Sequence, residues 1–278
     1  MLNFSLDVVT TAAILFIVAS GLLMIFGVMK IINFSHGAFL TVGGYASMIV
    51  TQCGLNWWWS LPFSLACGFV LGMLVERFIV RPLYARPLDA ILATWGLGII
   101  VGQIITLAFG RGVQMVASPV NGALHVAGAQ YSTYRLILVA VAVVVVLVLG
   151  GLLNGTRLGL QTRAVIMNEA LARGLGISSS RVRFLTFCVG AALASAAGTL
   201  ITPLSSVDPN MGVPWIVGAF MLVMVSGSSL VSLALACVML GGAQVAVSTY
   251  VNPVLGGVTI AVLAALLLRL RPEGFARG

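Results

Sequence analysis

The sequence predicts an all-α protein, a polytopic transmembrane bundle of eight or nine membrane segments. Hydrophobic residues make up 60% of the 278 positions and charged residues only 7%, whereas soluble globular domains carry about 25% charged residues. Several apolar runs are unbroken and reach the roughly 20 residues that a helix needs to cross a bilayer. This continuity excludes an outer-membrane barrel, whose strands alternate apolar and polar residues over about 10 positions.

The apolar runs suggest one transmembrane domain over residues 1–278, with a long polar interruption at 154–183. The N-terminus lacks a basic region and carries Asp7, so the first run is expected to be a retained span and not a cleaved signal peptide. The seventh and eighth runs could be re-entrant or half-length. The predicted spans are 8–29, 34–50, 61–80, 90–109, 136–153, 184–201, 215–231, 233–250 and 254–268.

Small residues recur at a spacing of four in three of these spans. That spacing places them on one helix face, where two backbones can approach closely. We expect these faces to be docking or sliding surfaces between helices. They are Gly68 with Gly72, Gly98 with Gly102, and Gly190 with Ala194 and Gly198.

The net charge of +8 reflects topology and not nucleic-acid binding, because Lys and Arg gather on the cytosolic side of membrane spans. Twelve of the 14 basic residues fall on one side if the loops near 30, 77–86, 154–183 and 269–278 share it. Arg111 and Arg135 fall opposite. This split predicts an exterior N-terminus and a cytosolic C-terminus.

A polar segment between the first two spans holds Asn33, Ser35, His36 and Gly37. Polar groups at membrane depth are costly and are tolerated mainly against protein or a wet cavity. One interpretation is a helix break that lines or gates a translocation path. The other is a turn in which Asn33 or Ser35 caps a helix and a carbonyl satisfies His36. His36 has no nearby acid or second histidine, so we predict neither a metal site nor a proton relay there. No cofactor is expected for the chain.

The segment 154–183 is the longest stretch that cannot lie in lipid, with five arginines and one glutamate. Residues 163–173 are helix-prone, and Gly174 and Gly176 are expected to stop that helix. The serines at 178–180 can cap the next one. The segment is either a solvated connector or a short cytosolic helix presented to a partner.

Three sequence landmarks resemble one transporter family. The run 168–177 (NEALARGLGI) resembles the cytosolic coupling loop, or EAA loop, of ABC-importer permeases. Its flanks, and the run 32–39 (INFSHGAF), are similar to permeases that import branched-chain amino acids. The ending 270–275 (LRPEGF) resembles the terminal motif of the same family. The landmarks occur in the expected order over nearly the whole chain.

The resemblance implies a permease subunit in a bacterial cytoplasmic (inner) membrane. It implies four kinds of partner: a second related permease or a second copy, two cytosolic ATPase subunits, an exterior substrate-binding protein, and lipid. Nucleic acid is not expected. The residues implied to couple to the ATPase are Arg163, Asn168, Glu169, Ala170, Gly174 and Gly176.

The run 215–221 (WIVGAFM) also looks like the urea and short-amide branch of the family. That branch carries an acid where Gly218 stands and a Gly-Gly-x-Gly run where 226–229 (SGSS) stands. These departures leave the solute open between branched-chain amino acids and urea or short amides.

Other functional classes fit less well. The chain contains no GxxxxGK[ST] motif, so ATP hydrolysis would need a separate subunit and the chain is not expected to be an enzyme. A secondary transporter would place an ionisable residue inside a span, whereas the six acids lie at expected span ends or in loops. A membrane enzyme would need paired carboxylates or a histidine cluster. A passive channel would not need the polar loop.

Overall fold

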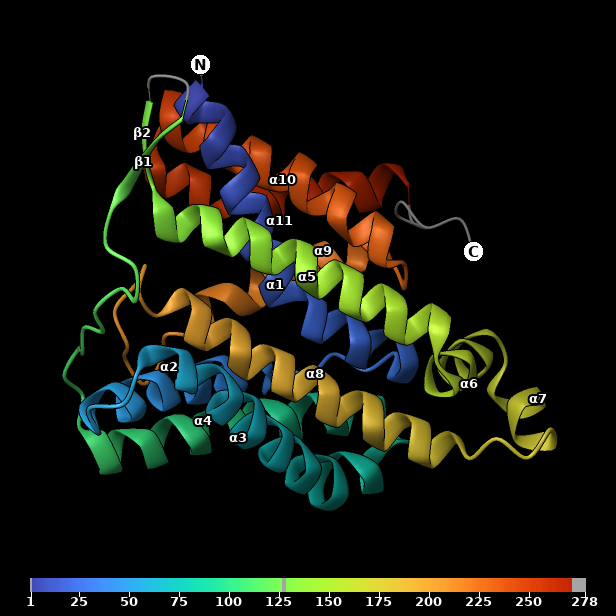
Figure 1. Cartoon of the computed structure of the whole chain (residues 1–278). Coiled ribbons are helices and arrows are strands. Elements are labelled where there is room, and N and C mark those ends of the chain that lie inside the picture. The colour runs from blue at the N-terminus through green and yellow to red at the C-terminus, as the bar shows by residue number, and fades with distance from the viewer. Residues whose placement is uncertain (1, 127–128, 272–278) are drawn as a thin grey trace.

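The computed structural model describes residues 2–126 and 129–271, and this part forms a bundle of helices (Figure 1). The described residues end before most of the terminal motif 270–275, so Glu273 lies outside them, as does Arg277 beyond the motif. The long helices are α1 (Leu2–Met29), α2 (His36–Gln52), α3 (Ser60–Val75), α4 (Pro87–Phe109), α5 (Thr133–Gly155), α8 (Ser179–Ile201), α9 (Val213–Ser226), α10 (Leu230–Tyr250) and α11 (Pro253–Leu270). The shorter elements are η1 (Trp57–Trp59), η2 (Glu76–Val80), η3 (Arg81–Leu83), α6 (Arg157–Met167), α7 (Glu169–Gly174), β1 (Ala123–Val126) and β2 (Ala129–Ser132).

The polytopic bundle predicted from composition is confirmed. In the described part, seven helical segments are long and apolar enough to cross a membrane, with α3 counted together with its flanking turns. Two further helices are shorter, α2 with 17 residues and α9 with 14. α9 ends at Ser226 because Gly227 takes a positive φ of 67°, so the seventh apolar run does not continue as one full-length span.

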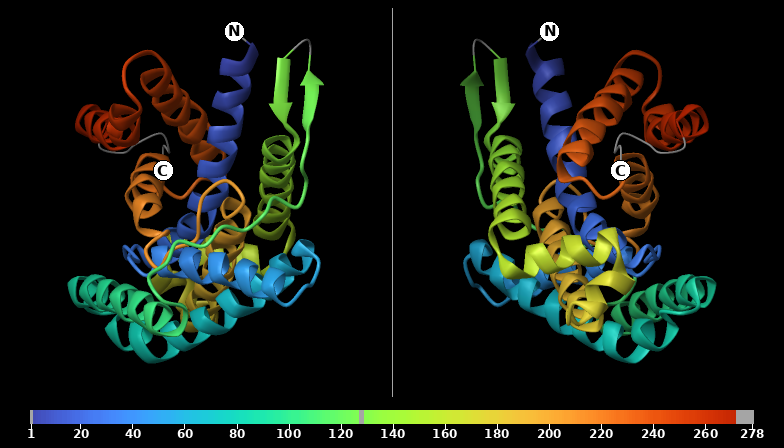
Figure 2. Two further views of the ribbon diagram at one scale, coloured as in Figure 1. Left: turned by 90° about the vertical axis from the view of Figure 1, so that its left-hand side faces the viewer. Right: turned by 90° about the vertical axis from the view of Figure 1, so that its right-hand side faces the viewer.

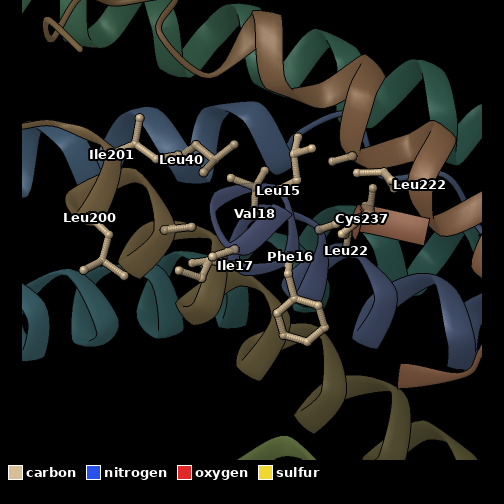
Figure 3. Packing of buried hydrophobic residues seen from close by; sticks show 14 of the residues in the cluster. Leu15, Phe16, Ile17, Val18, Leu22, Leu40, Leu200, Ile201, Leu222 and Cys237 are labelled. Carbon is tan, nitrogen blue, oxygen red and sulfur yellow. The ribbon is translucent and has the colours of Figure 1, made fainter. Parts of the chain in front are cut away.

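α1 lies at the centre of the bundle. Its most apolar 18-residue window is 89% buried within the chain, against 17% for the corresponding windows of α4, α5 and α11. Figure 3 shows Leu22 of α1 beside Cys237 of α10 and near Leu222 of α9, while Phe16 points to another side of α1. A helix that is apolar on all sides is stable when other helices surround it. The exposed apolar helices leave surface for lipid or for another subunit.

α8 packs against α1, α2 and α3 through small residues. A Cβ atom built at Gly198 would lie 1.9 Å from the carbonyl oxygen of Leu40, and one at Gly43 would lie 1.8 Å from that of Ser195. One at Gly68 would lie 2.7 Å from the carbonyl oxygen of Ala191. The predicted close approach is therefore confirmed for the faces on α3 and α8.

The third predicted face, on α4, is not a close helix contact. A Cβ atom at Gly98 would find its nearest neighbour at 3.8 Å and one at Gly102 at 3.6 Å, in both cases a carbonyl oxygen of a connecting segment. The expectation of tight helix packing there is wrong. The two glycines instead border a cavity described below.

A β-hairpin stands at the end of the bundle that carries the start of α1 (Figure 2). The stretch between the predicted spans 90–109 and 136–153, which has no span or strand signal in the sequence, therefore contains two strands. Tyr131 of β2 donates to Oδ1 of Asp7 at 2.8 Å, and Arg135 pairs with the same oxygen at 3.1 Å. Because α5 runs from this hairpin to α6, α6 and α7 lie at the opposite end (Figure 1).

Candidate functional site

The α6–α7 loop is anchored to the bundle by a small apolar cluster. Val165 of α6 and Ala172 of α7 are buried against Val28 at the end of α1 and Val182 at the start of α8. Burial of side chains from two spanning helices in one cluster attaches the loop to both. A displacement of the loop would therefore be passed to α1 and α8.

Asn168 divides the loop into two helices. Its backbone is extended, with φ −158° and ψ 100°, and its Oδ1 accepts a hydrogen bond from the Leu171 amide at 3.0 Å. The single helix expected over 163–173 is therefore wrong. The reason is local, because asparagine is among the best N-cap residues and satisfies an amide that has no partner within the helix. Arg163 lies before the break, exposed, and donates to Asn154 at 3.2 Å.

Glu169 is held by two arginines. Its carboxylate pairs with Arg173 on α7 and with Arg183 on α8, the latter at 2.5 Å. Partial burial by itself would raise the pKa of Glu169, but hydrogen bonding from Ser179 and the two guanidinium groups outweigh burial and lower the pKa. Glu169 is therefore ionised at neutral pH and ties α7 to α8. Arg183 was not singled out from the sequence, because only the fold brings it to Glu169.

Large apolar side chains are exposed on and beside α7. Met167, Leu171 and Leu175 are 86%, 62% and 73% exposed, and Ala170 is exposed beside them. Apolar side chains gathered on a surface indicate a contact with another protein or with a membrane. The same helix carries the ion-paired Glu169, and α7 lies at the end of the loop farthest from the bundle (Figure 1).

The two glycines that follow have different roles. Gly176 takes a positive φ of 82°, a conformation that favours glycine, whereas Gly174 is the last residue of α7 and has open space around it. The expectation that both stop the helix is therefore correct only for Gly176. Ser178 occupies the N-cap position of α8 but makes no side-chain capping bond, and Ser179 accepts from Arg173 Nε at 2.8 Å.

Arg183 also links the loop to the end of α3. Its guanidinium carbon lies 4.7 Å from the ring centroid of Tyr84, whose hydroxyl donates to Glu76. Burial first, and then the hydrogen bond and charge of Glu76, raise the pKa of Tyr84, so the hydroxyl remains a neutral donor. Glu76 is fully buried. It does follow the end of α3, but it is an interior residue and not the polar end of a span that the sequence suggests.

The polar segment before α2 is buried within the bundle. Asn33, Ser35 and His36 are at most 2% exposed. Asn33 Oδ1 accepts from the Ser35 amide at 3.1 Å, and Ser35 makes no side-chain cap. His36 Nε2 lies 3.0 Å from the carbonyl oxygen of Val18, as the turn interpretation expects. Burial contradicts a solvated turn, so these three side chains brace the junction of α1 and α2.

Gly37 is the predicted path residue that borders a cavity. The cavity measures about 270 Å³ and lies between α2, α4 and α9. Its lining is mostly apolar and includes the polar side chains of Thr41 and Asn210 and the indole of Trp95, and no described lining residue is charged. The lining residues are Phe34, Gly37, Ala38, Thr41, Trp95, Gly98, Ile99, Gly102, Pro209, Asn210, Val213, Ile216 and Val217.

Comparison with known proteins identifies the family. The sequence profile described as branched-chain amino acid transport system / permease component matches residues 4–269. The chain belongs to this family. The permease LivH of Escherichia coli K12 is 28% identical, with 96% of this chain and 92% of LivH aligned. BraD of Pseudomonas aeruginosa is 26% identical over 93% of this chain and 90% of BraD.

A solved structure shares the fold of this permease-family chain. PsaBC from Streptococcus pneumoniae, in complex with Fab, superposes with a TM-score of 0.51. It covers 97% of this chain and 92% of that chain, at 15% identity. Membership of the family confirms the resemblance drawn from the three sequence landmarks, and the chain is a transport component.

Proposed function

We propose that the chain is the transmembrane permease subunit of an ATP-driven ABC importer. Residues 1–278 would form one permease domain in a bacterial cytoplasmic (inner) membrane, with the N-terminus exterior and α6–α7 in the cytosol. Its partners would be a second permease, related or identical, two cytosolic ATPase subunits and an exterior substrate-binding protein. The second permease would cover part of the exposed apolar surface of α4, α5 or α11.

The observation that carries the proposal is the combination, on and beside α7, of exposed apolar side chains with an acid that is ion-paired to α8. Met167, Leu171 and Leu175 are exposed, while Glu169 is fixed to α8 through Arg183. An ATPase that docks on the apolar tip would push α7, and the ion pair and the apolar cluster beneath it would pass the displacement to α1 and α8. The predicted coupling residues Arg163, Asn168, Glu169, Ala170, Gly174 and Gly176 all lie in this loop.

The size and lining of the cavity bordered by Gly37 suit a small amphipathic solute. Its volume of about 270 Å³ is close to the lower end of typical ligand pockets, about 300–1,000 Å³. An uncharged lining with aromatic rings and a few hydrogen-bonding groups suits a compact solute with an apolar side chain. We therefore propose branched-chain amino acids or related small solutes as the cargo. Asn33, Ser35 and His36 would position the cavity wall and not touch the solute.

Uptake by the assembled transporter in proteoliposomes tests the energy source. Radiolabelled leucine should accumulate only when binding protein, ATPase subunits and ATP are all present, and a proton uncoupler should not reduce it. Replacing Met167, Leu171 and Leu175 together by serine should abolish uptake and ATPase binding. Replacing the exposed Val231, Leu235 and Met239 of α10 by serine, outside the surface proposed for the second permease, is a matched control that should leave ATPase binding unchanged. Accumulation without ATP, or collapse on uncoupling, would contradict the proposal.

A further inference from the structure

Three arginines line a groove that is separate from both the exposed surface of α7 and the cavity bordered by Gly37. The groove has a volume of about 500 Å³ and lies between the end of α3 and the start of α8. Arg77 and Arg81 come from η2 and η3, and Arg181 comes from the first turns of α8. Ser178 and Ser180 complete its polar part. The three positive charges thus come from two separate segments of the chain and face one space.

Within the described part of the chain, these arginines have no carboxylate partner. The ion pairs there join Arg86 to Asp89, Arg135 to Asp7, and Arg173 and Arg183 to Glu169. Glu76, the acid nearest along the chain to Arg77, is buried and accepts from Tyr84. Since the neighbouring acids are committed elsewhere, the charge in the groove is left for an anion that the chain does not supply.

The groove is apolar on the side that faces the membrane-spanning part of α3. Met73 and Phe184 line it, and Met73 is itself 36% exposed on α3. A basic rim above an exposed apolar helix face matches the two parts of a phospholipid. Basic pockets between helices at the cytosolic face of membrane proteins bind anionic headgroups in this way.

We propose that this groove binds the phosphate headgroup of an anionic phospholipid, on the side of the membrane that holds α6 and α7. Arg77, Arg81 and Arg181 would contact the phosphate, and the acyl chains would lie along Met73 and Phe184. The bound lipid would sit beside the residues that join α7 to α8.

Native mass spectrometry of the delipidated, assembled transporter tests the site. The affinity for phosphatidylglycerol should exceed the affinity for phosphatidylcholine. Each arginine should contribute about a fivefold factor to the ratio of the two affinities. The triple variant R77Q/R81Q/R181Q should retain the two lipids alike. The matched control R269Q/R271Q removes two exposed charges at the end of α11 and should retain phosphatidylglycerol as the wild type does.

A thermal-shift assay on the wild type tests the proposal without any variant. Phosphatidylglycerol should raise the melting temperature, whereas phosphatidylcholine and millimolar inorganic phosphate should not. Equal stabilisation by both lipids would overturn the proposal, because the arginines would then serve topology only. Equal stabilisation by inorganic phosphate would overturn the lipid assignment. A triple variant that keeps phosphatidylglycerol but loses its ATPase would make the groove a protein contact, and would also overturn it.

Discussion

Arg183 of α8 pairs with Glu169 of α7 at 2.5 Å while its guanidinium stacks on Tyr84, 4.7 Å from the ring centroid. Arg183, on the spanning helix α8, therefore contacts the exposed loop directly through Glu169. Through Tyr84 it is also linked to the buried Glu76 at the end of α3. A planar guanidinium can make both contacts at once, which a lysine cannot.

Replacing Arg183 should uncouple the loop from the bundle. We expect R183Q to lower ATP-driven uptake by about 10- to 100-fold, because hydrogen bonds to charged groups contribute about 1.5–3 kcal/mol. R183K should recover little, since it loses the stacking on Tyr84. Uptake and ATP hydrolysis are measured together in proteoliposomes. R157Q, which removes an exposed arginine of the same loop that is not among the predicted coupling residues, is the control, and equal losses in both variants would count against the special role of Arg183.

Acid should release α7 only well below neutral pH. The pKa of Glu169 is lowered from its ordinary value of 4.5, so the stabilisation from its ion pairs is present above that value and is lost as pH falls through the lower folded pKa. Hydrogen exchange at the α7 amides, corrected for intrinsic rates, should stay flat from about pH 8 to 5 and rise only below about pH 4.5. E169Q should show the faster exchange at every pH. A rise near pH 6–7 would mean that another group controls the loop.

The two loop glycines should respond differently to alanine. G176A forces a side chain into a left-handed conformation and should cost about 1–2 kcal/mol of local stability. G174A adds a methyl group to a helical residue in open space and should be neutral or stabilise by up to about 1 kcal/mol. Thermal melting and uptake of the two variants provide the comparison. A fall in melting temperature for G174A as large as that for G176A would contradict this difference, whereas a loss of uptake in G174A without a loss of stability is what a coupling role of Gly174 predicts.

Alanine at the α2–α8 crossing should destabilise the whole bundle. G198A places a methyl group 1.9 Å from the carbonyl oxygen of Leu40, and overpacking of this kind costs about 1–3 kcal/mol or more. G218A on α9, where a Cβ atom would find no neighbour within 4 Å, is the control. The melting temperature in detergent should fall for G198A alone. An unchanged melting temperature would show that the helices can separate at no cost.

Much of the fold follows from local sequence features. The spans follow from continuous apolar runs, because a bilayer imposes helix and length together. The close packing of α3 and α8 follows from small residues at a spacing of four. Gly98 and Gly102 have the same spacing without the same contact, since the pattern cannot specify whether a helix or a cavity faces the glycines. The hairpin escaped prediction because its four-residue strands sit in a stretch with no clear alternation.

The candidate site was predicted in part. The loop and Glu169 stand out as a charged stretch between apolar runs. Arg183 lies 14 residues from Glu169, and Tyr84 lies on another segment altogether, so their link exists only in the folded chain. The break at Asn168 had a readable cause, the N-cap preference of asparagine, which the helix propensity of the surrounding residues concealed. Burial of His36 depends on the approach of α1, whose Val18 carbonyl it contacts.

Site-directed cross-linking from the tip of α7 tests the central claim most directly. A photoreactive residue in place of Leu171, in the assembled transporter in native membranes, should cross-link to the ATPase subunit, and ATP should change the yield. A residue in place of Leu124 of β1, at the other end of α5, should give no ATPase product. Cross-linking from Leu171 only to lipid or to the exterior binding protein would contradict the account.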